Sequence, residues 1–359
     1  MTHRAWVGGF LLAGLLSATS AFAQGGRIEH VTVHARALEG NLLGDSPDRH
    51  VSLYLPAGYD EHPDARYPTV YLLHGYSATD GMWLAEGYIP DLDVEKIAND
   101  LIARGRIQPM ILVMPHASNA YDGSFYTNSP TSGNWEDFIT AGLVDYVDSH
   151  VRTLPRPESR AIARFSMGGY GALYLAMRHP ETYRAVYGMS PFPLGFEHAD
   201  IDLDLSPFAF LAARQALTAG ERPTSSHVSF AMAAAFSPDP GNPPAFVDLP
   251  YDLVDGKPHR IDAVWERWLE HSPLALVGTY AANLAQYRGV ALDAATDDGG
   301  SILSNATAFS SALSEAGVPH RFAVYEGTHG EEIAVRVHDI VLPFLSTNLE
   351  GATDLPSSP

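Results

Sequence analysis

The sequence predicts an α/β protein built on one mainly parallel β-sheet with helices on both faces. Short apolar runs, typical of strands buried on both faces, alternate along the chain with longer segments in which apolar residues recur at helical spacing. This alternation extends over most of the 359 residues. Hydrophobic residues make up 46% of the chain and it contains no cysteine, so the core must stabilise the fold without disulfides.

Residues 1–23 are of a different kind. Arg4 precedes an apolar run, and Ala21-Phe22-Ala23 is a small-x-small cleavage site. The run is too short to span a bilayer comfortably, so we expect a secretory signal peptide rather than a membrane anchor. This predicts a secreted or periplasmic protein in which residues 24–359 form one domain.

Within that domain, two stretches of alternating hydrophobicity, 28–33 and 50–55, predict an antiparallel hairpin at one edge of the sheet. Continuous apolar runs predict the buried strands, and periodic segments predict the helices. The strands are expected at 69–73, 110–114, 161–163, 185–189, 289–292 and 321–325, and the helices at 135–147, from 167 onward, at 301–316 and at 331–345.

Residues 192–288 interrupt the alternation with a segment rich in proline that also contains the aromatic sequence WERW at 265–268. An insertion of this size, placed soon after a parallel strand, is expected to form a cap over a site at the strand ends. The alternative is a surface insertion with no role in the site. The tail at 351–359 is expected to be disordered.

The chemistry is expected at residues 161–172, AIARFSMGGYGA. An apolar strand, a sharp turn with Ser166 at its tip and a helix form the pattern of a nucleophile elbow, in which the helix N-terminus favours developing negative charge. The usual G-x-S-x-G pattern is broken by Arg164 at its first glycine. Strand and helix crowd each other there, so we expect this long cationic side chain to fit poorly and to affect activity.

A serine hydroxyl becomes a strong nucleophile when a base accepts its proton and an acid orients that base. The predicted strand 321–325 runs into His329, which we expect to be the base. The predicted strand 289–292 runs into an acidic loop, in which Asp298 is the preferred acid because it lies farther into the loop. The alternatives are His320 and His338 for the base and Asp293 and Asp297 for the acid.

Acyl transfer also needs donors for an oxyanion. The N–H of Met167, directly after the serine, is one candidate, and the N–H of Tyr76, in the loop after strand 69–73, is the other. Aromatic side chains are candidates for lining the acyl or alcohol pocket, although a core role is equally open for each. They are Trp83, Tyr126, Trp135 and Trp265, of which Trp135 lies on the apolar face of its predicted helix.

The formal net charge of −20 would repel nucleic acid and anionic lipid, so neither is expected as a partner. Without cysteine, thiolate catalysis and cysteine-ligated metals are excluded, and no H-E-x-x-H motif is present. We therefore expect no cofactor, no metal and no membrane span after the N-terminal segment. The oligomeric state stays open.

Four motifs together resemble the esterase D/feruloyl esterase-like branch of the α/β-hydrolases. They are Leu72-Leu73-His74-Gly75, the elbow at 165–172, Asp293-x-x-Thr-x-Asp298 and Gly327-Thr-His329. This branch includes S-formylglutathione hydrolases, feruloyl and acetyl esterases acting on carbohydrate-linked esters, and mycolyltransferases. The resemblance covers roughly residues 28–191 and 289–347. Arg164 and Ala295 depart from it, because both stand where the branch often has glycine.

The resemblance implies a cofactor-free serine ester hydrolase that acts through an acyl-enzyme. It implies a triad of Ser166, His329 and Asp298, with Tyr76 and Met167 forming the oxyanion hole. The substrate would be a small-molecule or carbohydrate-linked ester, with acetyl, feruloyl, aliphatic and polyester groups all compatible. An acyltransferase with the same triad is one alternative. A weakly active or inert binding protein, impaired by Arg164, is another.

Overall fold

The computed structural model describes residues 25–196, 206–219 and 228–352. The predicted signal peptide at 1–23 lies outside the described residues, as does the predicted disordered tail from residue 353 onward. No helix within the described ranges combines the length and the apolar character that crossing a bilayer would need.

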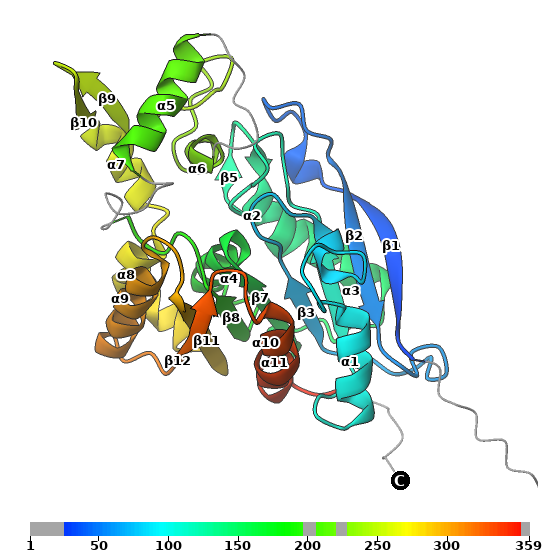
Figure 1. Cartoon of the computed structure of the whole chain (residues 1–359). Coiled ribbons are helices and arrows are strands. Elements are labelled where there is room, and N and C mark those ends of the chain that lie inside the picture. Colours follow the sequence, from blue (N-terminus) through cyan, green and yellow to red (C-terminus); the bar gives the residue numbers. More distant parts are fainter. Residues whose placement is uncertain (1–24, 197–205, 220–227, 353–359) are drawn as a thin grey trace, which may run out of the picture.

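The central sheet has eight strands in the order β1-β2-β4-β3-β7-β8-β11-β12 (Figure 1). From β4 to β12 neighbouring strands are parallel, whereas β2 is antiparallel to both β1 and β4. The prediction of a mainly parallel sheet with an N-terminal antiparallel hairpin at its edge is confirmed. The strands are β1 (Arg27–His34), β2 (Asp48–Leu55), β3 (Thr69–Leu72), β4 (Ile111–Pro115), β7 (Arg160–Phe165), β8 (Ala185–Met189), β11 (Gly289–Asp297) and β12 (Arg321–Thr328).

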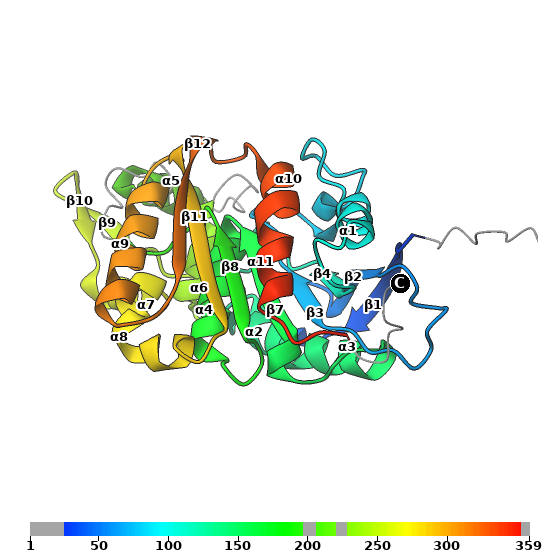
Figure 2. The ribbon, with the colours of Figure 1, turned by 90° about the horizontal axis from the view of Figure 1, so that it is seen from below.

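Helices cover both faces of this sheet, as Figure 2 shows for α1 and α11 on one side and α3 and α4 on the other. Successive strand residues point to opposite faces, so the core is split in two. Ile162 belongs to the core under α4, and its neighbours Ala161 and Ala163 belong to the core under α1 and α11. The helices are α1 (Val94–Ala103), α2 (Trp135–Asp137), α3 (Leu143–His150), α4 (Met167–Arg178), α8 (Pro273–Leu284), α9 (Ile302–Glu315), α10 (Ile333–Arg336) and α11 (Leu342–Thr347).

Two predicted helices are more irregular than their apolar spacing suggests. The segment predicted at 135–147 contains a π-helical stretch, Phe138–Gly142, between α2 and α3, and it continues to His150. The segment predicted at 331–345 contains a second one, Val337–Val341, between α10 and α11. In both cases the helical path continues through the π turn, so the apolar face is kept.

The insertion at 192–288 contains α5 (Pro207–Thr218), α6 (Val228–Phe236), the hairpin of β9 (Tyr251–Val254) and β10 (Lys257–Arg260), and α7 (Asp262–Leu269), and it ends in α8. Phe236 of α6 packs against Trp268 of α7 and against Tyr170 of the elbow helix, with ring centroids 5.4 and 5.7 Å apart. The insertion is therefore packed onto the helix that follows Ser166. Its role as a cap stays a prediction.

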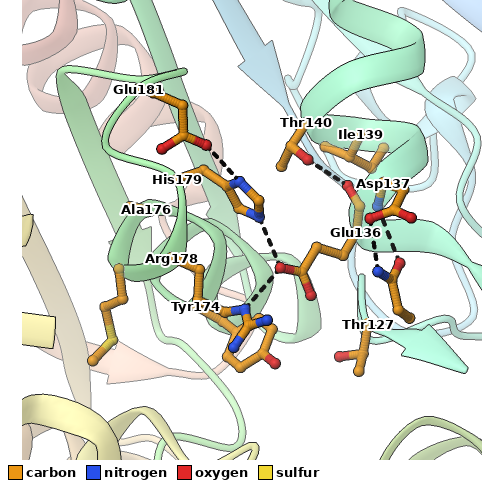
Figure 3. Close-up of polar contacts among 12 residues, drawn as sticks. Thr127, Glu136, Asp137, Ile139, Thr140, Tyr174, Ala176, Arg178, His179 and Glu181 are labelled. Carbon is orange, nitrogen blue, oxygen red and sulfur yellow. Dashed lines mark hydrogen bonds and ion pairs between the residues drawn. The ribbon is translucent and has the colours of Figure 1, made fainter. Parts of the chain in front are cut away.

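A charged cluster joins α2 to the far end of the elbow helix α4 (Figure 3). The nearly buried Glu136 carboxylate accepts hydrogen bonds from Nε of Arg178 and Nε2 of His179, both at 2.7 Å, and Nδ1 of His179 lies 2.9 Å from Glu181. Burial opposes ionisation of both groups, but the hydrogen bonds outweigh it, so the pKa of Glu136 is lowered and the pKa of His179 is raised. The cluster fastens the helix that directly follows the candidate nucleophile.

We expect Glu136→Gln to lower the free energy of unfolding by about 2 kcal/mol, because it removes the counterion of two partly buried cations. The lowered pKa of Glu136 contributes stability above its unfolded pKa, which is lost as the pH falls. The raised pKa of His179 contributes stability below its unfolded pKa, which is lost as the pH rises. The loss should therefore be largest between pH 4.5 and 6.5, the unshifted values of the two groups.

Urea titrations of wild type and variant across this range measure that difference. Glu181→Gln is the matched control, because this exposed carboxylate contacts the same imidazole and should cost little. An equal loss for Glu136→Gln at every pH would contradict the role given to the cluster.

Candidate active site

Ser166 occupies the turn between β7 and α4, with φ 59° and ψ −129°. A positive φ is strained for a residue with a side chain, and such strain persists only where surrounding contacts hold it. Here the Ser166 N–H donates to the Met189 carbonyl at 2.9 Å, and the Ser166 carbonyl accepts from the N–H of Phe192 at 3.2 Å. The strand, sharp turn and helix predicted from residues 161–172 are present with serine at the tip.

His329 and Asp298 lie next to this serine. Nε2 of His329 is 2.9 Å from Oγ of Ser166, and Nδ1 of His329 is 2.5 Å from Oδ1 of Asp298. His329 directly follows β12, and its ring packs on Phe165 with centroids 4.5 Å apart. The structure thus brings together the three side chains that sequence reasoning selected, in hydrogen-bonding order serine, histidine, aspartate.

The buried Asp298 carboxylate is held by several donors. Burial raises its pKa, but hydrogen bonds from His329, from the Ser190 side chain and from the Ala295 N–H at 2.9 Å outweigh burial, so its pKa is lowered. The carboxylate is therefore ionised at neutral pH, which suits a group that must orient and stabilise an imidazolium. Ala295, at a position where glycine was expected, supplies this contact through its backbone.

The alternative residues have other partners. Asp293 is fully buried and pairs with the Arg336 guanidinium, and Asp297 is exposed. Nε2 of His320 lies 2.7 Å from Oγ of Ser310, and Nε2 of His338 lies 3.1 Å from Asp100. Among the candidate acids and bases, Asp298 and His329 are therefore the two that form the hydrogen-bonded chain to Ser166.

The two candidate oxyanion donors lie beside the nucleophile. Met167 is the first residue of α4, so its N–H has no acceptor within the helix. Gly75, directly before Tyr76, is so close to the elbow that a Cβ placed on it would lie 3.7 Å from Cβ of Ser166. A Cβ on Gly123 would lie 2.7 Å from both the Tyr76 ring and the Met167 sulfur, so these two side chains meet at that glycine.

The structure contradicts the predicted pocket role of three aromatic residues. Trp83, Tyr126 and Trp135 are at most 1% exposed and belong to the core. The indole N–H of Trp83 donates to the Leu73 carbonyl at 3.1 Å, the Tyr126 hydroxyl donates to the His74 carbonyl at 2.8 Å, and the indole N–H of Trp135 donates to the Ser132 carbonyl at 2.8 Å. Each therefore has its polar atom satisfied by backbone rather than directed to a pocket.

Two of these residues still matter for the site, because Trp83 and Tyr126 hold the strand end and loop that lead to Tyr76. The fourth aromatic candidate, Trp265, is half-buried in the insertion and packs on Phe196 with centroids 5.8 Å apart. Its pocket role stays a prediction.

Arg164 is accommodated, contrary to the expected misfit. Its side chain is fully buried, its guanidinium lies 4.6 Å from the Trp83 ring centroid, and its Nη2 contacts the Met82 sulfur. Its Cγ lies against Gly168, because a Cβ added to Gly168 would be only 2.0 Å from this Cγ. The crowding expected from the missing first glycine is avoided because a glycine on the helix side supplies the space.

We expect Gly168→Ala to lower the free energy of unfolding by about 3 kcal/mol, because the new Cβ would overlap Arg164 Cγ and the His74 carbonyl oxygen. Gly278→Ala is the matched control, since Gly278 is an exposed residue of α8 with nothing near its Cβ position. That change should stabilise the protein by up to about 1 kcal/mol. Denaturant titration measures both, and unchanged stability of Gly168→Ala would refute the packing described for Arg164.

Within the ranges that the structure describes, no three or more histidine, aspartate or glutamate side chains gather in a way that could hold a metal ion.

The fold and the site geometry define an α/β-hydrolase with a serine, a histidine and an aspartate at the C-terminal ends of its parallel strands. Residues 46–333 match the family described as "Putative esterase". The chain belongs to this esterase family. The predicted branch of the α/β-hydrolases is confirmed, and the predicted enzyme class, a carboxylic-ester hydrolase, is the class of this family.

Curated relatives include an endo-1,4-beta-xylanase/feruloyl esterase of Xylanibacter ruminicola, 30% identical over 37% of this chain and 18% of that protein. Another is Esterase Rv1288 of Mycobacterium tuberculosis, 33% identical over 36% of this chain and 26% of that protein. The matches therefore span about a quarter or less of these relatives.

Solved structures with the same fold cover nearly the whole chain. A ferulic acid esterase superimposes with a TM-score of 0.61 at 22% identity, covering 90% of this chain and 99% of that one. An S-formylglutathione hydrolase from Agrobacterium tumefaciens superimposes with a TM-score of 0.57 at 16% identity, covering 91% and 96%. At these identities the likeness establishes the fold.

Proposed function

We propose that this chain is a serine ester hydrolase in which Ser166, His329 and Asp298 form the catalytic triad. The observation that carries the proposal is the pair of contacts of His329, at 2.9 Å to the serine hydroxyl and 2.5 Å to the carboxylate, on a strained elbow in an esterase-family chain. The buried, ionised Asp298 supports it as well, because such a group fixes the histidine tautomer.

In the first half-reaction, Ser166 Oγ attacks the ester carbonyl carbon while His329 Nε2 accepts the hydroxyl proton. The N–H groups of Met167 and Tyr76 bind the resulting oxyanion. As the intermediate collapses, His329 returns the proton to the departing alcohol oxygen and the acyl group stays on Ser166. In the second half-reaction, water activated by His329 attacks this acyl-enzyme and releases the acid.

The intact geometry around Arg164 favours an active enzyme over an inert binding protein, since the serine hydroxyl contacts the imidazole despite the substitution. One relative is named as an endo-1,4-beta-xylanase/feruloyl esterase and one structural neighbour as a ferulic acid esterase, and we propose small-molecule or carbohydrate-linked esters as the substrate class.

A panel of esters tests this function. It comprises p-nitrophenyl acetate, p-nitrophenyl butyrate and methyl ferulate, and at least one should be hydrolysed with a rate that depends on Ser166. If wild type hydrolyses none of these esters faster than Ser166→Ala does, the proposal is contradicted. The same assays with an added sugar alcohol test the acyltransferase alternative, which predicts a new ester in place of free acid.

We also propose export, on the strength of the N-terminal sequence pattern alone. N-terminal sequencing of the protein recovered outside the cytoplasm should begin at Gln24. A chain recovered in the cytoplasm with residues 1–23 intact would refute this.

A further inference from the structure

The positive charge of Arg164 lies directly behind the loop that carries the candidate oxyanion donor. Nη2 of Arg164 is 3.5 Å from the position that a Cβ on Gly75 would take, and Cβ of Ser166 is 3.7 Å from the same position. The guanidinium and the nucleophile thus flank one glycine, the residue before Tyr76. On this geometry Nη2 of Arg164 and Cβ of Ser166 are no more than about 7 Å apart, close enough for a Coulomb interaction in the protein interior.

This cation is buried without an anion. Among the described residues Arg164 forms no ion pair with a carboxylate; Nε donates to the Phe165 carbonyl at 3.2 Å, and Nη1 has no hydrogen-bond partner. Burial lowers the pKa of Arg164 to about 9, so it is still protonated at neutral pH. A buried charge without a counterion costs free energy, so its persistence calls for a compensating interaction.

Among the described residues, no carboxylate is one of the groups that face Arg164. These groups are the Trp83 and Phe165 rings, the Met82 thioether, the Tyr88 phenol, and the fully buried His74 and Tyr126. Burial lowers the pKa of His74 to about 3, and burial raises the pKa of Tyr126 well above neutral. In the part of the chain that the structure describes, no group beside the guanidinium therefore supplies the missing negative charge before the reaction begins.

We propose that Arg164 stabilises the oxyanion formed at Ser166, acting as a buried positive charge behind the Gly75–Tyr76 loop. The inference rests on the proposed function, because that oxyanion exists only if Ser166 is the nucleophile. Negative charge appears there in the transition state and not in the bound ester, so the attraction lowers the barrier without tightening ground-state binding. Arg164 touches neither substrate nor triad and is a supporting residue.

The test compares a neutral and a charged replacement. Arg164→Met keeps an unbranched side chain beside Trp83 but removes the charge, and we expect kcat to fall about 10- to 50-fold with KM nearly unchanged. Arg164→Lys can also carry a positive charge, and at pH values where its amine is protonated it should be faster than Arg164→Met.

A packing role alone predicts otherwise: both replacements would lose similar activity at every pH, with KM changing as much as kcat, and that result would overturn the inference. Rates are expressed per active site titrated with a phosphorylating inhibitor of serine hydrolases, so that misfolded molecules are not counted. Arg164→Gln provides a second neutral variant. Met82→Leu alters a side chain that contacts the guanidinium but leaves the charge of Arg164 in place, so this variant should behave as wild type.

Ser166→Ala separates this inference from the proposed function. If wild-type hydrolysis does not depend on Ser166, the proposed function fails and this inference fails with it. If hydrolysis depends on Ser166 and Arg164→Met is as fast as wild type, only the inference about Arg164 fails.

Discussion

Replacing Ser166 by alanine should reduce kcat for p-nitrophenyl acetate by at least about 10⁴-fold while leaving the fold intact. The hydroxyl is the atom that would form the covalent bond, and no other side chain can take its place at the elbow tip. Its removal also deletes the 2.9 Å contact with His329, but the backbone bonds that hold the turn remain. KM should change far less than kcat, because the ester contacts the rest of the site as before.

Ser149→Ala is the matched control for this variant. Ser149 is an exposed serine of α3 whose hydroxyl bonds to the backbone of its own helix, so its loss should leave hydrolysis unchanged. Equal activity of Ser166→Ala and wild type would exclude Ser166 as the nucleophile.

Asp298→Asn is expected to lower kcat by about 10³-fold or more at neutral pH. The amide cannot stabilise an imidazolium, and it can present N–H to Nδ1 of His329, which favours the wrong tautomer. The buried carboxylate makes its 2.5 Å contact with that nitrogen in the ground state, so the substitution acts on a preformed interaction.

The neighbouring Asp297 gives a sharp comparison, since it carries the same functional group one residue away and is exposed. Asp297→Asn should retain nearly full activity. A larger loss for Asp297→Asn than for Asp298→Asn would show that the acid has been assigned to the wrong carboxylate. Circular dichroism of both variants checks that neither loss reflects unfolding.

The sheet and the candidate triad could be predicted from sequence because they depend on strand ends. Ser166, Asp298 and His329 each follow a run of apolar residues, and parallel strands bring the residues after them to one edge. The helix α1 was missed, although Asp93 caps it and its apolar residues at 94, 97, 98 and 101 have helical spacing. That signal was available in the sequence.

The aromatic residues and Arg164 could not be placed from sequence, because their surroundings come from distant segments. Trp83 reaches the Leu73 carbonyl and the Arg164 guanidinium, and nothing local distinguishes this buried orientation from one facing a pocket. The misfit expected for Arg164 rested on its immediate neighbours. Gly168 supplies the space for its Cγ, but the contacts of its guanidinium are made by Met82 and Trp83, some eighty residues earlier in the chain.

Trapping of the acyl-enzyme tests most directly whether Ser166, His329 and Asp298 work as one ester-cleaving unit. The protein is mixed with p-nitrophenyl acetate, quenched in acid within the first turnovers, digested and analysed by mass spectrometry. We expect one acetyl group on the peptide that contains Ser166, and none on that peptide once the ester is exhausted. Rapid hydrolysis with no acetyl on Ser166, or with the acetyl on another residue whose removal abolishes activity, would contradict the account.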